Sequence, residues 1–249
     1  ALQHLDEITT RLRGRQPAVF LDFDGTLAPI VDRPEQAAMD PPMRAAVERI
    51  ARSCPVAVVS GRDLPDVRRR VGLDGIYYAG SHGFDIAGPH GTHHEHRKGT
   101  EALPALDDAE RMLREAVQDL GGALIDRKHF SIAVHYRLAH PADVAAIEAA
   151  VDAALGRFGG LRKGHGKKVF ELQPDVDWDK GAAVRWLLRS LSLDGPDVLP
   201  IYVGDDVTDE DAFRVLADDG LCCAVLDAPR PTAAHFRLAD PGEVRLLLL

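Results

Sequence analysis

The sequence predicts an α/β protein in which a doubly wound parallel sheet is interrupted by an inserted α+β domain. Short apolar runs at residues 18–21, 55–59 and 199–203 are continuous rather than alternating, which is typical of strands buried on both faces of a sheet. Helical patterns accompany these runs, as a doubly wound fold requires. The pattern changes between residues 101 and 174. We therefore expect a core of residues 1–100 and 175–249 and an inserted domain of residues 101–174.

Two helices of the core are predicted from apolar spacing. Residues 42–53 follow a Pro-Pro start at residues 41–42 and place Met43, Val47 and Ile50 on one face, and residues 180–191 repeat this kind of pattern. Two shorter apolar runs, residues 75–79 and 221–226, extend the predicted sheet.

The inserted domain is predicted to contain an αββ unit twice. Its expected elements are a helix at 105–120, strands at 123–126 and 131–137, a helix at 142–158, and strands near 161 and at 168–172. Apolar and polar residues alternate in residues 131–137, which favours an antiparallel sheet with one open face.

Composition limits the classes of function. The chain has 249 residues and a formal net charge of -9, which argues against binding to nucleic acid or to an anionic membrane surface. No apolar run approaches the roughly 20 residues that span a bilayer. Residues 1–15 lack the apolar segment of a secretory signal, and three cysteines cannot form a disulfide framework. We expect a cytoplasmic monomer with small buried cysteines.

Polar side chains follow each of the three apolar runs. The first run ends in Asp22-Phe23-Asp24-Gly25-Thr26, the second in Ser60-Gly61-Arg62, and the third in Gly204-Asp205-Asp206 with Asp209 nearby. Ligands of doubly wound sheets bind outside the carboxyl ends of the strands, so the three clusters are expected to form one site.

The residue types at this site indicate phosphoryl transfer. Carboxylates in one crevice repel one another unless a cation such as Mg²⁺ joins them. Asp22 and Asp24 point to the same side of a strand end, so one can attack phosphorus while the other moves protons. Backbone N–H groups around Gly25 and the Ser60 hydroxyl would face the phosphate, and Lys180 would add positive charge at a helix start.

Each motif taken alone has a simpler structural interpretation. Asp-x-Asp-Gly-Thr could form only a turn, and Ser60 or Asp63 could cap a helix. Lys180 could be a solvated helix residue. His93, His94 and His96 suggest a transition-metal site, but adjacent residues on an extended strand point in opposite directions, which argues against a shared metal ion.

The four ordered motifs resemble those of the haloacid dehalogenase superfamily, which has a Rossmann-like core and, in one subclass, a C2-type cap. The resemblance implies Asp22 as nucleophile and Asp24 as general acid and then base. The implied phosphate-binding residues are Gly25, Thr26, Ser60, Gly61 and Lys180. Mg²⁺ would be held by Asp22, the Asp24 carbonyl and Asp205, with Asp206 and Asp209 supporting it.

Further strings are similar to the trehalose-6-phosphate phosphatase family. They are Val59-Ser60-Gly61-Arg62, Ala79-Gly80-Ser81-His82-Gly83, Val134-His135-Tyr136-Arg137, Gly166-Lys167-Lys168 and the segment from Gly204 to Glu210. The resemblance implies hydrolysis of trehalose 6-phosphate to trehalose and phosphate through an aspartyl-phosphate, as a step of trehalose biosynthesis. The implied substrate-binding residues are Arg62, His82, Gly83, Asp126, Lys128, His135, Arg137, Lys167 and Glu171. Asp126 stands where the family has Glu, and Gln173 where Arg or Lys is common.

Two alternatives remain open at this point. Another capped sugar phosphatase, acting on sucrose 6-phosphate or a mannosyl phosphate, would share the core motifs. A phospho-accepting receiver module also carries a strand-end Asp beside acidic residues, but receivers are much shorter, and an inserted α+β domain has no place in them.

Overall fold

The computed structural model describes residues 1–31, 33–166 and 168–249 of the chain. The chain divides into two compact units. The core unit comprises Ala1–His94 and Trp178–Leu249, and the inserted unit comprises Glu95–Asp177. The sequence-based division placed the boundaries at 101 and 174. The inserted unit begins earlier because the short helix α4 (Arg97–Glu101) lies against α5 (Leu103–Val117).

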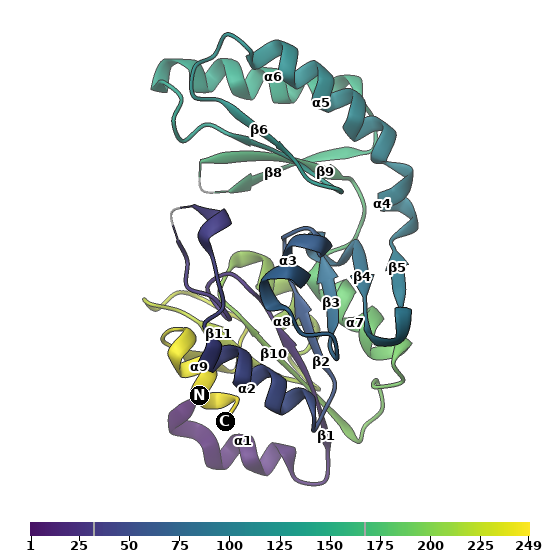
Figure 1. Cartoon of the computed structure of the whole chain (residues 1–249), viewed down its shortest axis with the longest axis vertical. Coiled ribbons are helices and arrows are strands. Elements are labelled where there is room, and N and C mark those ends of the chain that lie inside the picture. Colours follow the sequence, from purple (N-terminus) through teal and green to yellow (C-terminus); the bar gives the residue numbers. More distant parts are fainter. Residues whose placement is uncertain (32, 167) are drawn as a thin grey trace. The chain divides into compact units, whose positions relative to one another are not determined.

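The core unit is built on a sheet with the order β12-β11-β10-β1-β2-β3-β4-β5 (Figure 1). Its strands are β1 (Gln16–Leu21), β2 (Val56–Val59), β3 (Tyr77–Gly80), β4 (Asp85–Ala87), β5 (His93–Glu95), β10 (Val198–Gly204), β11 (Leu221–Val225) and β12 (Phe236–Leu238). Strands β12 to β3 are parallel, and β4 pairs antiparallel with β3. The doubly wound sheet expected from the continuous apolar runs is confirmed.

Helices cover both faces of this sheet. The apolar side chains of one face pack with α1 (Leu5–Leu12), α2 (Pro41–Ala51), α3 (Leu64–Val71) and α9 (Pro241–Leu247). Those of the other face pack with α7 (Lys180–Ser190) and α8 (Glu210–Val215). The side chain of Asp40 accepts a hydrogen bond of 2.7 Å from the N–H of Met43, which fixes the start of α2 at its two prolines.

The inserted unit is an antiparallel sheet with helices on one face (Figure 1). Its strands are β6 (Leu124–Arg127), β7 (Ile132–His135), β8 (Leu161–Gly166) and β9 (Val169–Pro174), in the order β6-β7-β9-β8. Helices α5 and α6 (Val144–Arg157) bury apolar residues against the sheet. The predicted pair of αββ units is present, and the alternation in β7 leaves Ala133 and His135 on the face away from the helices.

Short 3₁₀ helices complete the chain. They are η1 (Leu2–His4), η2 (Pro34–Gln36), η3 (Ser81–Gly83), η4 (Pro89–Gly91), η5 (Pro141–Asp143) and η6 (Val207–Asp209). Among the described residues, no helix is long and apolar enough to cross a membrane.

The three cysteines are free and buried, as expected. Burial raises the pKa of the Cys54 thiol to about 11 and those of Cys222 and Cys223 to about 12. The thiols therefore stay protonated at neutral pH and act as small apolar side chains.

Candidate active site

The three polar clusters meet because β1, β2 and β10 are parallel neighbours. Leu21, the last residue of β1, pairs with Val58 of β2 and with Val203 of β10. The next backbone N–H, that of Asp22, donates to the Val203 carbonyl at 2.9 Å. Asp22 and Ser60 are 4% and 1% exposed, so the strand ends place both side chains inside the fold.

The turn after β1 requires glycine at position 25. Gly25 has a φ of +82°, and a Cβ there would lie 2.1 Å from Oδ2 of Asp205. Its N–H donates to the Ala28 carbonyl at 2.7 Å. This N–H therefore belongs to the turn, and the missing side chain at Gly25 permits the close approach of Asp205. Thr26 is fully buried, and its Oγ1 has no hydrogen-bond partner among the described residues, which is unusual for a buried hydroxyl.

Lys180 is the first residue of α7, whose N-terminus is capped by the Asp179 side chain on the N–H of Ala182 at 2.8 Å. Its Nζ lies 2.7 Å from Oδ1 of Asp22 and 2.7 Å from Oδ1 of Asp209. Burial lowers the pKa of Lys180, but the two carboxylates outweigh burial and raise it above its usual value. Lys180 is therefore a buried permanent cation rather than a solvated helix residue.

Asp209 is fully buried, and each of its oxygens accepts two hydrogen bonds. Oδ1 accepts from Lys180 and, at 2.7 Å, from the Tyr202 hydroxyl, while Oδ2 accepts from the N–H groups of Asp205 at 3.0 Å and Asp206 at 2.9 Å. The Asp206 side chain is exposed and forms a capping box with Asp209 at η6. Asp209 thus shapes the loop that presents Asp205.

The buried carboxylates create a site suited to a cation. Burial raises the pKa of Asp22 well above its usual value, with Asp209 and Asp205 adding to the shift against the effect of Lys180. Burial and Asp209 raise the pKa of Asp205 to about 7. Oxygen atoms of Asp22, Asp205 and Asp209 lie within 4.8 Å of one another. Oxygen donors with surplus negative charge are the ligands that Mg²⁺ prefers, so the residues fit this ion.

Arg62, expected to bind substrate, contacts Asp24. Two of its nitrogens reach both oxygens of the Asp24 carboxylate, at 2.6 and 2.7 Å. The Ser60 hydroxyl oxygen accepts from the Arg62 N–H at 3.2 Å, which is a turn contact. Asp63 is the N-cap residue of α3 but makes no capping hydrogen bond there; its side chain accepts from Ser81.

The loop holding His82 and Gly83 is fastened to the Ser-Gly-Arg motif. The N–H of Ser81 donates to the Arg62 carbonyl at 2.7 Å, and that of His82 donates to the Ser60 carbonyl at 2.8 Å. A Cβ at Gly61 would lie 2.8 Å from the His82 ring, so the ring lies directly against this motif. Gly83 has a φ of +94° and faces Ala183 of α7.

Four predicted substrate-binding residues lie together on the inserted unit. Ala133 pairs with both Asp126 and Glu171, which places these acidic residues in one row across β6, β7 and β9. Nζ of Lys128 lies 4.0 Å from Oε1 of Glu171. Burial lowers the pKa of His135. The Lys128 charge lowers this pKa further, whereas the Asp126 charge acts in the opposite direction. This open sheet face carries both hydrogen-bond donors and acceptors.

Two further residues were expected to bind the substrate, Arg137 and Lys167. Arg137 is exposed in the turn after β7. Lys167 lies outside the described residues.

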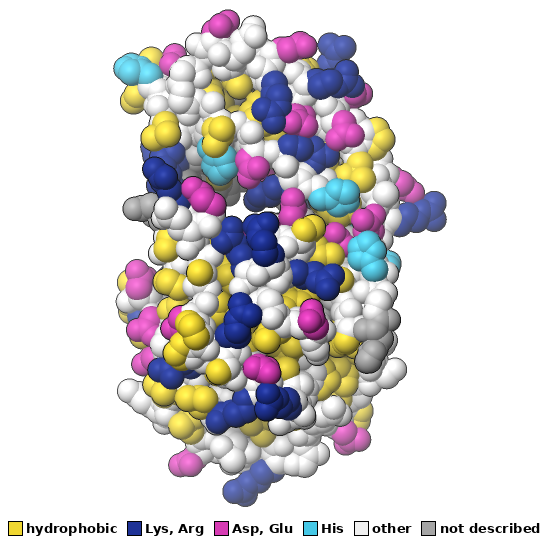
Figure 2. Space-filling model, in the orientation of Figure 1, with side chains coloured by type: hydrophobic (Ala, Val, Ile, Leu, Met, Phe, Trp, Pro, Cys, Tyr) yellow, Lys and Arg dark blue, Asp and Glu magenta, His cyan; other side chains and the backbone are white. Residues whose placement is uncertain are grey.

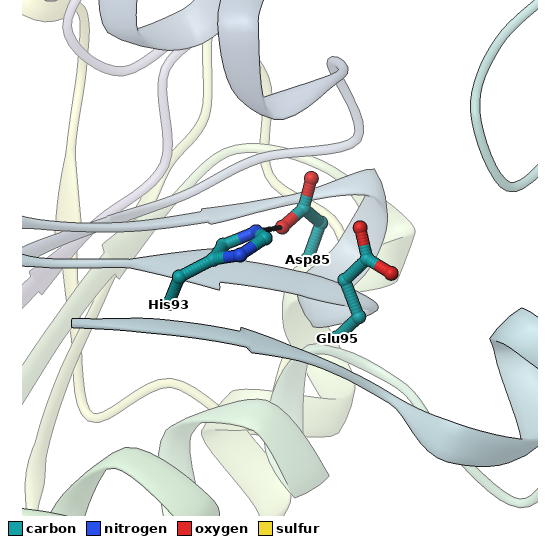
Figure 3. A group of neighbouring side chains, drawn as sticks. All are labelled: Asp85, His93 and Glu95. Atoms are coloured by element: carbon teal, nitrogen blue, oxygen red, sulfur yellow. Dashed lines mark hydrogen bonds and ion pairs between the residues drawn. The ribbon is translucent and has the colours of Figure 1, made fainter. Parts of the chain in front are cut away.

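The histidines of β5 point in opposite directions, as predicted. Nε2 of His93 lies 2.8 Å from Oδ1 of Asp85 on the neighbouring strand β4 (Figure 3). The ring of His94 instead stacks on Trp186, with centroids 4.4 Å apart. The two adjacent histidine rings therefore have different partners.

Three residues at the core site were missed from the sequence. Tyr202 was assigned only to an apolar strand, although a buried hydroxyl needs a partner and so signals a polar neighbour. Asp66 and Arg70 stand four and eight residues after Arg62, a helical spacing that indicates ion pairs.

The sequence and the fold both resemble those of known proteins. Residues 20–241 match the model of a family described as trehalose-phosphatase. A trehalose-phosphate phosphatase of Mycobacterium tuberculosis is 47% identical over 248 residues, which cover 98% of this chain and 63% of that protein. The corresponding protein of Mycobacterium marinum is 46% identical over 237 residues, 92% of this chain and 60% of that protein.

Solved structures show the same fold. A structure described as a trehalose-6-phosphate phosphatase related protein has a TM-score of 0.79 and 28% identity, covering 93% of this chain and 95% of that one. The chain spans about 60% of the length of the curated phosphatases it matches. With the family model matching most of its length, the chain belongs to the trehalose-phosphatase family.

Proposed function

We propose that this chain is a cytoplasmic, Mg²⁺-dependent phosphatase that hydrolyses trehalose 6-phosphate to trehalose and phosphate. The observation that carries the proposal is the buried group formed by Asp22, Lys180 and Asp209, with both nitrogen–oxygen distances at 2.7 Å. It fixes one carboxylate at a strand end beside a permanent cation, which is what attack on a phosphate needs.

Hydrolysis would occur in two steps. An oxygen of Asp22 forms a bond to phosphorus while the bond from phosphorus to the sugar oxygen breaks, and Asp24 gives that oxygen a proton. A water molecule then attacks the aspartyl-phosphate and loses its proton to Asp24, which releases phosphate and restores Asp22.

The remaining core residues would position the phosphate. Lys180, Ser60 and Thr26 supply a cation and two hydroxyl groups, and Gly61 permits the approach of His82. Mg²⁺, when bound by Asp22, the Asp24 carbonyl and Asp205, would neutralise charge on the phosphate oxygens. Asp209 and Asp206 would act by shaping the Asp205 loop.

The inserted unit would recognise the sugar. Asp126, Lys128, His135 and Glu171 present carboxylates, an ammonium group and an imidazole on one sheet face, a set suited to sugar hydroxyls. Arg137, in the turn after β7, and Lys167 are proposed to contribute as well. Recognition of a disaccharide rather than a small phosphate ester would then depend on this face.

The test is phosphate release from a panel of trehalose 6-phosphate, sucrose 6-phosphate and glucose 6-phosphate, with MgCl₂ and with EDTA. We expect release from trehalose 6-phosphate, dependent on Mg²⁺ and abolished by Asp22→Asn. Equal kcat/KM for all three esters would contradict the substrate assignment. Near wild-type turnover by Asp22→Asn would contradict the mechanism.

A further inference from the structure

The guanidinium group of Arg62 is held against the end of β1. Nε and Nη2 donate to the two oxygens of Asp24, and the group lies over the Phe23 ring, 5.4 Å from its centroid. The Arg62 side chain is 12% exposed, whereas that of Asp24 is 42% exposed. A fixed arginine thus holds an otherwise accessible carboxylate by two parallel hydrogen bonds, a geometry that specifies orientation.

Asp66 on α3 in turn holds Arg62. Its Oδ2 accepts from Nη1 of Arg62 at 2.9 Å and from Nε of Arg70 at 2.7 Å, and its Oδ1 accepts from Arg69. Burial raises the pKa of Asp66, but the hydrogen bonds from Arg70 and Arg62 outweigh it and lower the pKa. Asp66 is therefore ionised at neutral pH and neutralises part of a basic cluster.

The same network fastens the loop containing η2. Nη2 of Arg62 donates to the Pro34 carbonyl at 2.8 Å, and Nη1 of Arg70 donates to the carbonyls of Glu35 at 3.1 Å and Ala37 at 2.6 Å. Lys and Arg side chains gather in the region where Figure 1 places α3 (Figure 2). The Asp66 carboxylate therefore accepts hydrogen bonds from both arginines, Arg62 and Arg70, that contact the loop containing η2.

We propose that Asp66 is a positioning residue for the phosphatase reaction, which through Arg62 fixes the carboxylate of Asp24 for proton transfer. This inference rests on the proposed function, in which Asp24 serves both steps. Among the contacts of the described residues, Asp66 reaches Asp24 through Arg62, and it holds the loop containing η2 through Arg62 and Arg70. A misplacement of about 1 Å at a reacting group costs up to about a hundredfold in rate.

The first experiment compares Asp66→Asn with the wild-type full chain, using trehalose 6-phosphate with saturating Mg²⁺. We expect kcat to fall by about tenfold to a hundredfold with KM within about twofold, because Asp24 moves protons rather than binding the sugar. The control is Glu48→Gln, which removes a carboxylate from an exposed i,i+4 pair with Arg52 on α2. The control should keep the wild-type kcat.

A double-mutant cycle separates positioning from general destabilisation. Arg62→Lys keeps the positive charge but cannot bridge Asp24 and Asp66 together, so it should show the same loss of kcat. If Asp66 acts through Arg62, the double variant should be no slower than either single variant. Additive losses, or a wild-type kcat for Asp66→Asn, would overturn the proposal while leaving the proposed function intact.

Hydrogen exchange tests the network independently of turnover. In Asp66→Asn, the amides of residues 27–31 and 33–39 should exchange faster than in the wild type, since two arginines lose their anchor. Exchange unchanged in this segment would overturn the proposal even if the wild-type protein released no phosphate. Absence of wild-type activity would by itself contradict only the proposed function.

Discussion

Nζ of Lys180 lies 2.7 Å from Oδ1 of Asp22, and the two side chains are 3% and 6% exposed. Removing one partner of such a buried pair leaves an uncompensated charge. Lys180→Met should therefore lower the free energy of unfolding by about 3–5 kcal/mol in urea titrations without Mg²⁺. Adding Asp22→Asn to this variant should recover part of the loss, because it removes one of the two buried carboxylates that lost the Lys180 cation.

The matched control for this charge pair is Arg214→Gln on α8. Arg214 pairs with Asp211 at 2.6 Å, but the side chains are 62% and 37% exposed. An exposed pair contributes about 1 kcal/mol or less. Equal urea midpoints for Lys180→Met and the wild type would show that the buried pair does not stabilise the fold.

Asp205 makes the stability of the metal-free protein depend on pH. Its pKa rises from an ordinary value of 3.8 to about 7 because of burial and Asp209. Between these values the folded state holds a proton that the unfolded state has released, so stability falls as pH rises. With EDTA present, Tm should therefore decrease from pH 5 to pH 8.

Magnesium should oppose this pH effect. Mg²⁺ and the proton compete for the Asp205 carboxylate, so apparent Mg²⁺ affinity should increase as pH rises through about 7. Calorimetric titration of the protein with MgCl₂ at pH 6 and pH 8 measures this difference. A Kd independent of pH would argue against Asp205 as a ligand.

Gly25 and Gly14 offer a matched comparison of backbone strain and space. Both have positive φ, +82° and +72°, but a Cβ at Gly25 meets Asp205 at 2.1 Å, whereas a Cβ at Gly14 meets nothing within 4 Å. Each Ala substitution should lower stability by about 1 kcal/mol through backbone strain. Only Gly25→Ala should also lose phosphate release and weaken Mg²⁺ binding.

Phosphate release and chemical denaturation of the two Ala variants check this comparison. If Gly14→Ala lost as much activity as Gly25→Ala, strain alone would account for the effect, and the contact with Asp205 would be irrelevant to the site.

The sheet and its strand-end residues were predictable because continuous apolar runs specify buried parallel strands, and parallel strands bring their carboxyl ends together. Asp22, Ser60 and Asp205 are placed by that rule alone. Lys180 was expected at the site because it brings positive charge to a helix start, and in the structure α7 begins at the same edge of the sheet. These positions depend on backbone direction, which the sequence pattern determines.

The partners of long side chains were not predictable in this way. Arg62 was predicted to bind substrate; in the structure it contacts Asp24, a residue far from it in the sequence, and spacing does not predict that pairing. Backbone N–H groups around Gly25 were expected to face a phosphate, and the turn uses the N–H of Gly25 itself for the Ala28 carbonyl, a detail that the motif does not specify. Such assignments depend on tertiary packing rather than on local spacing.

Glu171 should affect recognition of the sugar more than the chemistry. Its Oε1 accepts from the Ser131 hydroxyl at 2.9 Å and lies near Lys128, on the open face of the inserted sheet. Glu171→Gln should raise KM for trehalose 6-phosphate by about tenfold, because a carboxylate hydrogen bond to a hydroxyl contributes about 1.5–3 kcal/mol. Hydrolysis of p-nitrophenyl phosphate, which has no sugar, should change by less than about twofold.

Glu148→Gln is the control for this variant, because Glu148 pairs with Lys163 and extends from α6, on the helix-covered side of the same sheet. It should leave both substrates unaffected. The decisive quantity is the ratio of kcat/KM for the two substrates. If Glu171→Gln lowered both values equally, the residue would act on the fold or the chemistry, and the open sheet face would not be the site of sugar recognition.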